Sequence, residues 1–234
     1  MYFGIFDPTI ILLIPAILFT MFAQAKVKNA YAKYSLIPTK RGISGRQAAR
    51  IILDNNGMSH VPIEEISGQL TDNYNPKEDT MSLSQGIYAG TSIASVAVAA
   101  HESGHAIQDG TEYGFLKFRI AMVPVVNLVS GASWPLILIG LAIIWAGNLT
   151  TGNLLFNIGI VMFTVVVLFH TVTLPVELNA SKRAIEQLVD LNIIDADEVD
   201  GAKKVLSAAA MTYVAALATS VLNLVRILMI RGRD

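Results

Sequence analysis

The uncharged stretch Ile120–Ala146, IAMVPVVNLVSGASWPLILIGLAIIWA, decides the fold class of this chain. A helix that crosses about 30 Å of hydrocarbon needs about 20 apolar residues. The stretch exceeds that length and contains no ionisable side chain, which is typical of a membrane-spanning helix. Pro124 and Pro135 lie inside it, and we expect them to kink the helix because proline removes a backbone hydrogen bond.

The composition of the whole chain points the same way. Of its 234 residues, 53% are hydrophobic and 15% are charged, whereas soluble domains contain about 25% charged residues. The 17 basic residues are balanced by 18 acidic ones, which argues against a nucleic-acid-binding protein and against a disordered chain. The absence of cysteine excludes disulfides, Cys-ligated zinc, iron–sulfur clusters and a thiol nucleophile.

Three further segments have the length, or nearly the length, of a membrane span: Pro8–Ala25, Leu154–Leu174 and Val205–Val225. Small residues fill the last of them and let helices approach closely, so we expect it to pack against protein; whether it crosses completely stays open. The chain therefore predicts a mainly α-helical integral membrane protein with about four transmembrane helices.

The first segment could be an anchor or a signal peptide. Asp7 and Pro8 are typical of a helix start, as N-cap and first helical residue. Ala23-Gln24-Ala25 resembles a cleavage site, but the residues before the apolar segment include no lysine or arginine, which signal peptides carry. We therefore favour an uncleaved anchor.

Basic residues near the membrane predict the orientation. Five of them follow the first segment with no acidic residue in between: Lys26, Lys28, Lys33, Lys40 and Arg41. The positive-inside rule then places residues 26–118 and 175–204 in the cytoplasm. Arg231 and Arg233 would lie outside, against the rule, so the side of the C-terminus stays open.

The polar stretch after the first segment predicts a small α+β domain. Ser44 and Gln47 form a capping-box pattern, with Ile43 placed as a staple, for a helix that ends at Gly57. Polar and apolar residues alternate over Thr80–Ser84, which predicts a strand. A helical pattern follows from about Tyr88 to Gln108.

The strongest motif lies in that helical pattern: Val98-Ala99-Ala100-His101-Glu102-Ser103-Gly104-His105-Ala106, an H-E-x-x-H sequence. Spacing of four places both imidazoles on one helix face, where they can bind one Zn²⁺. Glu102 beside them is the candidate general base, which takes a proton from the attacking water. Gly104 leaves room on the face between the histidines. The alternative interpretation is a structural pair of histidines with a salt-bridged glutamate.

A catalytic zinc needs a third protein ligand. Without cysteine, the candidates are His60, His170 and a carboxylate. Glu177 stands out among the carboxylates because two predicted spans separate it from the histidines, which returns it to the same side of the membrane. Spacing alone does not decide whether Glu177 is a metal ligand or an ordinary exposed glutamate.

At these residues the chain resembles the YugP-like neutral zinc metallopeptidases of bacterial membranes. The resemblance lies in L-T-D-N-Y-N-P at 70–76, the segment 83–93, A-A-H-E-S-G-H-A-I-Q at 99–108 and L-P-V-E-L-N-A-S-K-R-A at 174–184. This family is similar in plan to the HtpX-type and CaaX-prenyl-type membrane proteases, which are gluzincins. The resemblance implies a zincin-like catalytic domain and Glu177 as the third zinc ligand. It departs at Ser181, where those relatives carry an aspartate that orients a zinc-bound histidine.

Two residues are secondary candidates for stabilising the oxyanion of the reaction. His170 lies near the end of a predicted span, where an ionisable residue defaults to a functional interpretation, although a packing role is the stronger alternative. Arg183 lies six residues past Glu177, off its helix face by simple counting. His60 lies in a turn-rich stretch, and we expect it to be exposed.

The predicted strand Thr80–Ser84 suggests how a substrate is held. Met81 and Leu83 would face inward, and we expect this strand to be an edge of a small sheet. An edge offers unpaired N–H and C=O groups to which an extended peptide can add. Met81, Ser82 and Leu83 are therefore the candidate substrate-binding edge of an endopeptidase with loose sequence preference, which acts on extended or unfolded segments near the membrane.

The predicted organisation has five segments: an anchor at 1–25, a zincin-like catalytic domain at 26–118, a transmembrane hairpin at 119–174, a third-ligand helix with linker at 175–204, and a C-terminal transmembrane or membrane-packed helix at 205–234. The expected partners are the lipid bilayer and a peptide or membrane-protein substrate, and the expected cofactor is one Zn²⁺ per chain. The rival interpretations are a Zip-like metal transporter and a membrane scaffold with a vestigial site.

Overall fold

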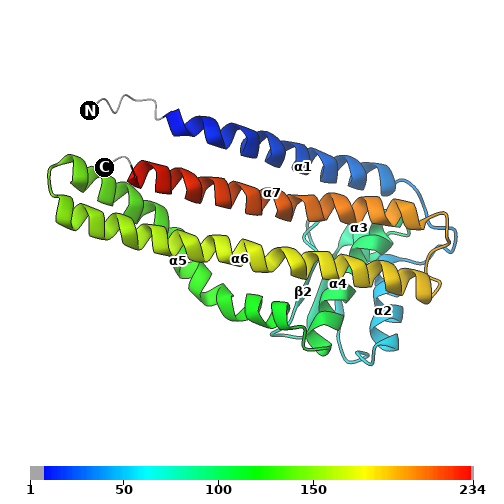
Figure 1. Cartoon of the computed structure of the whole chain (residues 1–234). Coiled ribbons are helices and arrows are strands. Elements are labelled where there is room, and N and C mark those ends of the chain that lie inside the picture. Colours follow the sequence, from blue (N-terminus) through cyan, green and yellow to red (C-terminus); the bar gives the residue numbers. More distant parts are fainter. Residues whose placement is uncertain (1–7, 233–234) are drawn as a thin grey trace. The chain divides into compact units, whose positions relative to one another are not determined.

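The computed structural model describes residues 8–232 and is mainly helical (Figure 1). Its elements, in chain order, are the 3₁₀ helix η1 (Pro8–Leu12), α1 (Leu13–Tyr34), α2 (Gly45–Asn55), β1 (Ile63–Ile66), β2 (Asn73–Asn75), β3 (Thr80–Ser84), α3 (Gln85–Tyr88), α4 (Ile93–Gly110), α5 (Gly114–Trp145), α6 (Leu149–Asp190) and α7 (Val199–Arg231). The expected N-cap, Asp7, lies outside the described residues. Two compact units share these elements.

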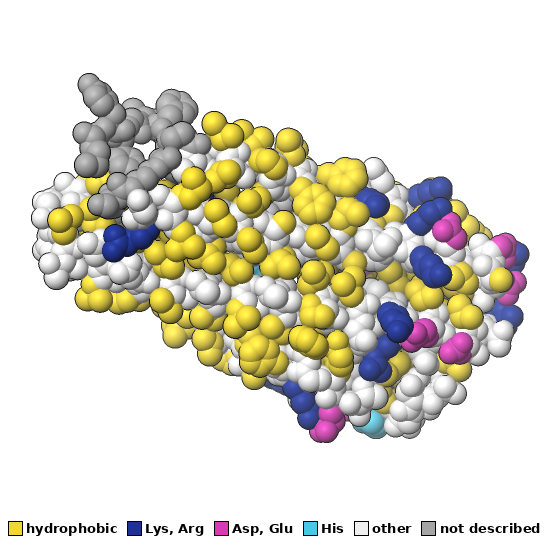
Figure 2. All heavy atoms as spheres, viewed as in Figure 1, with side chains coloured by type: hydrophobic (Ala, Val, Ile, Leu, Met, Phe, Trp, Pro, Cys, Tyr) yellow, Lys and Arg dark blue, Asp and Glu magenta, His cyan; other side chains and the backbone are white. Residues whose placement is uncertain are grey.

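The first unit takes in the chain up to Phe22, Phe118–Leu174 and the chain from Tyr213. It holds the apolar parts of α1, α5, α6 and α7, and all four helices are long and apolar enough to cross a membrane. Over this unit the visible surface carries many hydrophobic side chains and few charged ones (Figure 2). All four predicted spans therefore lie in long helices of the expected character.

The helices of the first unit pack through aromatic and aliphatic side chains. Ile137 on α5, Phe156 and Phe163 on α6, and Ile227 on α7 form one buried cluster. A Cβ on Gly140 would lie 2.6 Å from the Phe156 backbone nitrogen, so α5 and α6 approach more closely than a side chain there would allow. Interior proline does not end these helices: Pro124 and Pro135 lie inside α5, and Pro175 lies inside α6.

The second unit comprises Ala23–Lys117 and Pro175–Thr212. α4 lies at its centre, and most of its residues between Ile93 and Gln108 are buried. α2, the end of α6 and the start of α7 pack around α4 in one apolar cluster, and the sheet packs with it in a second. Burying a helix on several sides requires small apolar residues, which the run Ala94–Ala100 supplies.

Local signals in the second unit correctly predict several element boundaries. Ser44 is the N-cap of α2 and forms both halves of a capping box with Gln47. The helix ends before Gly57, which has φ +73°. α6 continues past Leu174 to Asp190, whereas α1 runs beyond the predicted end of the first segment at Ala25 and ends at Tyr34.

One predicted helix is shorter than expected. Tyr88 belongs to the short helix α3, and α4 begins only at Ile93, after the N-cap Ser92, whose side chain accepts a hydrogen bond from the Ser95 backbone. Gly90 lies in the break, where a Cβ would collide with the Gly86 carbonyl oxygen. The chain turns tightly there, which the helical spacing of apolar residues does not reveal.

The sheet has the order β1-β3-β2, and this corrects the predicted substrate-binding edge. The strand Thr80–Ser84 is β3, as expected, but it pairs in parallel with β1 and antiparallel with β2. Met81, Ser82 and Leu83 therefore belong to the central strand and are not an edge. The sheet edges are β1 and β2.

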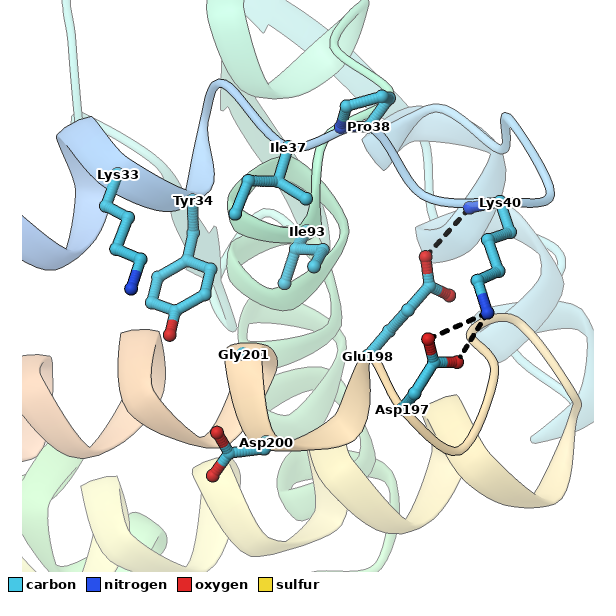
Figure 3. Close-up of a pocket in the computed structure, with 10 residues that line it drawn as sticks. All are labelled: Lys33, Tyr34, Ile37, Pro38, Lys40, Ile93, Asp197, Glu198, Asp200 and Gly201. Atoms are coloured by element: carbon cyan, nitrogen blue, oxygen red, sulfur yellow. Dashed lines mark hydrogen bonds and ion pairs between the residues drawn. The ribbon is translucent and has the colours of Figure 1, made fainter.

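A cluster of polar contacts ties the loop after α1 to the start of α7 (Figure 3). Buried Glu198 accepts backbone hydrogen bonds from Lys40 and Asp195, both at 2.8 Å. Lys40 Nζ also pairs with Asp197 at 2.7 Å, and the hydrogen bond to Asp197 raises the pKa of Lys40. Because these groups bind one another across the pocket in Figure 3, we assign them to holding the two segments together.

Candidate metal centre

Two elements of the second unit bring three metal-binding side chains together. His101 and His105 lie one turn apart on α4, with ring centres 4.8 Å apart, and Glu177 comes from α6. Glu177 Oε2 lies 3.3 Å from His101 Nε2 and 3.5 Å from His105 Nε2. These three are the group of His, Asp and Glu side chains in the described residues that could hold a metal ion.

The spacing of the donor atoms fits zinc. Zinc binds imidazole nitrogen and carboxylate oxygen at about 2.0–2.2 Å in a tetrahedron, so two ligand atoms lie about 3.4 Å apart. The distances of 3.3 and 3.5 Å from Glu177 Oε2 match this value. Three protein ligands leave a fourth position for water or substrate, as in catalytic zinc sites.

Gly104 allows α4 and α6 to meet at the site. A Cβ at this position would lie 2.5 Å from the carbonyl oxygen of Ala180, on the turn of α6 that follows Glu177. Any side chain would push the two backbones apart and move Glu177 away from the histidines. The room that Gly104 leaves is thus occupied by the α6 backbone.

A further polar group contacts the Nδ1 atom of each histidine. Ser181 Oγ lies 3.1 Å from His101 Nδ1, and Gln108 Oε1 lies 3.0 Å from His105 Nδ1. Gln108 Nε2 donates to the Val176 carbonyl at 2.8 Å, so its oxygen must be the atom that faces His105. His105 Nδ1 then carries the proton, which leaves Nε2 free to bind metal.

Glu102 lies beside the three ligands and is buried, with 8% of its surface exposed. Its Oε2 accepts a hydrogen bond from the backbone N–H of Tyr74 on β2 at 3.1 Å. Burial raises the pKa of Glu102, the negative charges of Glu177 and Asp72 add to the rise, and His101 and His105 oppose it. A carboxylate with a raised pKa is a stronger base.

The groups around His105 raise its pKa. Burial alone would lower it, but the hydrogen bond to Glu177 and the charge of Glu102 outweigh burial, so the pKa of His105 is raised. Two carboxylates, Glu102 and Glu177, thus act on His105, and such a setting suits a cation.

The other predicted site residues lie outside the ligand group. His60 is exposed, as expected, and pairs with Asp79 at 2.9 Å. His170 belongs to the part of α6 in the first unit, where its ring contacts Phe169. Arg183 donates to Asn179 Oδ1 at 2.9 Å, and its guanidinium lies 6.0 Å from the centre of the Tyr113 ring.

Three residues of the site escaped sequence reasoning: Gln108, Asn179 and Tyr74. Gln108 lies three residues after His105, a spacing that places both on one face of a helix and could have indicated the contact. Asn179 accepts from both Gln108 and Arg183, at 3.0 and 2.9 Å, and so links Arg183 to His105 through Gln108. Nothing local identifies Tyr74, because its contact with Glu102 depends on where β2 lies in the sheet.

Comparison with known proteins identifies the family of the chain. A family model described as "Putative neutral zinc metallopeptidase" matches residues 9–232. The chain is 43% identical over 228 residues to "Putative membrane protease YugP" of Bacillus subtilis (strain 168), a match that covers 96% of this chain and 98% of that protein. No solved structure matches it. Neither similarity favours the metal transporter or the scaffold. The match over nearly the whole length, together with the His101–His105–Glu177 cluster, shows that the chain belongs to the family of neutral zinc metallopeptidases.

Proposed function

We propose that this chain is a membrane-embedded zinc endopeptidase of the gluzincin type, with His101, His105 and Glu177 as the zinc ligands. The observation that carries the proposal is the position of Glu177 Oε2, 3.3 and 3.5 Å from the two imidazole nitrogens. Two imidazoles on one helix and a glutamate on another form a donor set typical of catalytic zinc.

The residues around the ligands suit peptide hydrolysis. Bound zinc would polarise the substrate carbonyl and lower the pKa of water to about 7. Glu102 takes the proton from that water and passes it to the leaving amine, as a general base and then a general acid. Its burial suits the first step, because a raised pKa strengthens the carboxylate as a proton acceptor.

Ser181 and Gln108 orient the ligands. Ser181 contacts His101 Nδ1, the position for which the related families use aspartate. Gln108 fixes the protonated nitrogen of His105. Arg183 is tied to this network through Asn179, which supports a role in holding the network together more than one at the oxyanion.

An extended substrate pairs with β2 in this proposal. Met81 on β3 lies opposite Tyr74 on β2. The Met81 N–H donates to the Pro62 carbonyl, so it points toward β1 and away from β2. The Tyr74 N–H points the other way and contacts Glu102. The outer edge of β2 therefore runs past the general base, where the Tyr74 carbonyl could accept a hydrogen bond from an added peptide strand, since the Tyr74 N–H is already bonded to Glu102.

The membrane placement rests on the four long apolar helices and on the lysines that follow the first apolar segment. We propose that the second unit faces the cytoplasm of a bacterial cell. Glu177 lies three residues past Leu174, where the apolar part of α6 ends. This closeness along α6 supports extended segments next to the membrane as the substrates.

Two substitutions test the chemistry. Glu102→Gln should keep one zinc per chain but abolish cleavage of casein, because Glu102 is a base and not a ligand. Glu177→Ala should lose most of the zinc. Glu186→Ala is the matched control, since Glu186 is an exposed glutamate on the same helix. Normal cleavage by Glu102→Gln would refute the assignment of the base, and full zinc content in Glu177→Ala would refute the third ligand.

A further inference from the structure

A groove that the proposed chemistry does not use lies in the second unit, between α1, the loop that joins β1 to β2, and Thr212, the last α7 residue of this unit. Gln24, Val27, Lys28 and Tyr31 follow one another at helical spacing along its α1 wall. Leu70 forms the facing wall.

Leu70 is held in an unfavourable backbone conformation with its side chain outward. Its φ is +56°, in the left-handed region that costs a leucine about 1–2 kcal/mol. Gly68, at φ +110°, and a hydrogen bond from Thr71 Oγ1 to Ser67 O shape the loop. The leucine side chain remains 43% exposed. A strained residue with an exposed apolar side chain is a candidate contact for something outside the fold.

The groove lies near the points where two helices pass from the second unit into the first. Gln24 is two residues past Phe22, the last α1 residue of the first unit, and Thr212 is the last α7 residue of the second unit, directly before Tyr213. At about 1.5 Å of rise per residue, the groove starts within one turn of both points. In the membrane placement proposed above, on which this inference rests, that is the depth of the lipid headgroups.

The positive charge of the groove favours an anionic lipid. Lys28 lines it, Lys26 lies on the same stretch of α1 outside the lining, and the lining contains no acidic residue. An apolar wall next to a lysine matches an acyl chain next to a phosphate, because a lysine can extend its stem along apolar surface and leave its ammonium at the headgroup.

We propose that this groove binds an anionic phospholipid of the surrounding leaflet, with the phosphate at Lys28 and the acyl chain between Val27 and Leu70. The lipid then stabilises the strained loop, which leads directly through Asp72 into β2. Asp72 accepts hydrogen bonds from the Ser84 backbone and hydroxyl, so the end of this loop is fixed to the sheet next to Glu102.

The experiment uses the full chain, which has no cysteine of its own. Single-cysteine variants are labelled with the fluorophore nitrobenzoxadiazole and placed in vesicles of phosphatidylcholine, with or without phosphatidylglycerol. The vesicles also contain lipids that carry a nitroxide quencher at a known depth. Leu70→Cys is the test position. Leu18→Cys, in the apolar part of α1, tests the membrane placement, and Leu36→Cys, 83% exposed beyond the end of α1, is the control outside the groove.

We expect shallow nitroxides to quench the label at position 70 at least twofold more strongly with phosphatidylglycerol than without it, and Lys28→Gln to remove that difference. Deep nitroxides should quench the label at position 18. Neither shallow nor deep nitroxides should quench the label at position 36. Quenching at 18 but not at 70 would refute the lipid site and leave the membrane placement intact. No quenching at 18 would refute the membrane placement itself.

Two other results would also overturn the proposal. Equal quenching at 70 in both kinds of vesicle would show that the headgroup charge is not recognised. A response of the label at 70 to a soluble peptide substrate, without quenching by lipid, would assign the groove to substrate.

Discussion

Ser181 shows how much a single side chain behind a ligand matters at this site. Its hydroxyl lies 3.1 Å from His101 Nδ1, whereas the related families place a carboxylate there. A neutral hydroxyl orients the imidazole but withdraws its proton less strongly than an aspartate does. The proposed centre should therefore bind zinc more weakly than a centre with an aspartate at this position.

We predict that Ser181→Ala lowers zinc affinity about 10-fold, because groups behind metal ligands typically contribute 10–100-fold. Ser181→Asp should bind zinc at least as tightly as the wild type. Competition with a fluorescent chelator measures both. Ser103→Ala is the control, since this buried serine on α4 bonds to the carbonyl of Ala99. Unchanged affinity in Ser181→Ala would mean that the contact has no role in metal binding.

The packing of α4 against α6 positions the metal ligands at the level of whole elements. The closest approach is at Gly104, one residue before His105 and opposite Ala180. Helix separation here would carry Glu177 away from both histidines, so packing and metal binding depend on the same contact.

Gly104→Ala should therefore lower stability by about 1–3 kcal/mol, the usual cost of overpacking, and weaken zinc binding as well. Thermal unfolding and metal content measure the two effects. Gly110→Ala is the matched control at the end of the same helix, where a Cβ would meet Met58 at an ordinary 3.5 Å. A Gly104→Ala variant with normal zinc affinity would contradict the proposed coupling.

The order of the strands makes β2 the edge that faces Glu102, and this can be tested from the substrate side. A strand pairs through every second residue. N-methylation of one peptide nitrogen at a time in a model substrate should therefore reduce kcat/KM about 10-fold at the nitrogen that reaches the Tyr74 carbonyl and much less at its neighbours. Equal effects at all positions would argue against pairing with a strand.

The orientation of the whole molecule follows from charge, and no local contact specifies it. Lysines after the first apolar segment predict that the second unit is cytoplasmic. A reporter fused near Asn73 should behave as cytoplasmic, and one fused at residues 147–148, between α5 and α6, as external. Alkaline phosphatase and green fluorescent protein fusions distinguish the two sides. The reverse pair of results would invert the orientation and leave the chemistry unchanged.

Features that depend on neighbouring residues could be read from the chain alone. The pair His101 and His105 follows from helical spacing, the capping box at Ser44 from local hydrogen bonding, and the four long helices from runs of apolar residues. Periodicity and capping act over a few residues, so they predict elements and the half of the ligand set that one helix carries. The resemblance to a known family then singled out Glu177.

Contacts between distant segments required the folded chain. The alternation over Thr80–Ser84 correctly predicts a strand, but its central place depends on β1 and β2 pairing on both sides of it. Glu177 reaches the histidines because glycine at 104 lets α6 approach α4, and Gln108 and Tyr74 acquire their roles from the same packing. Strand order and side-chain partners are set by the packing of segments far apart in the chain, and the local pattern of each segment is compatible with more than one arrangement.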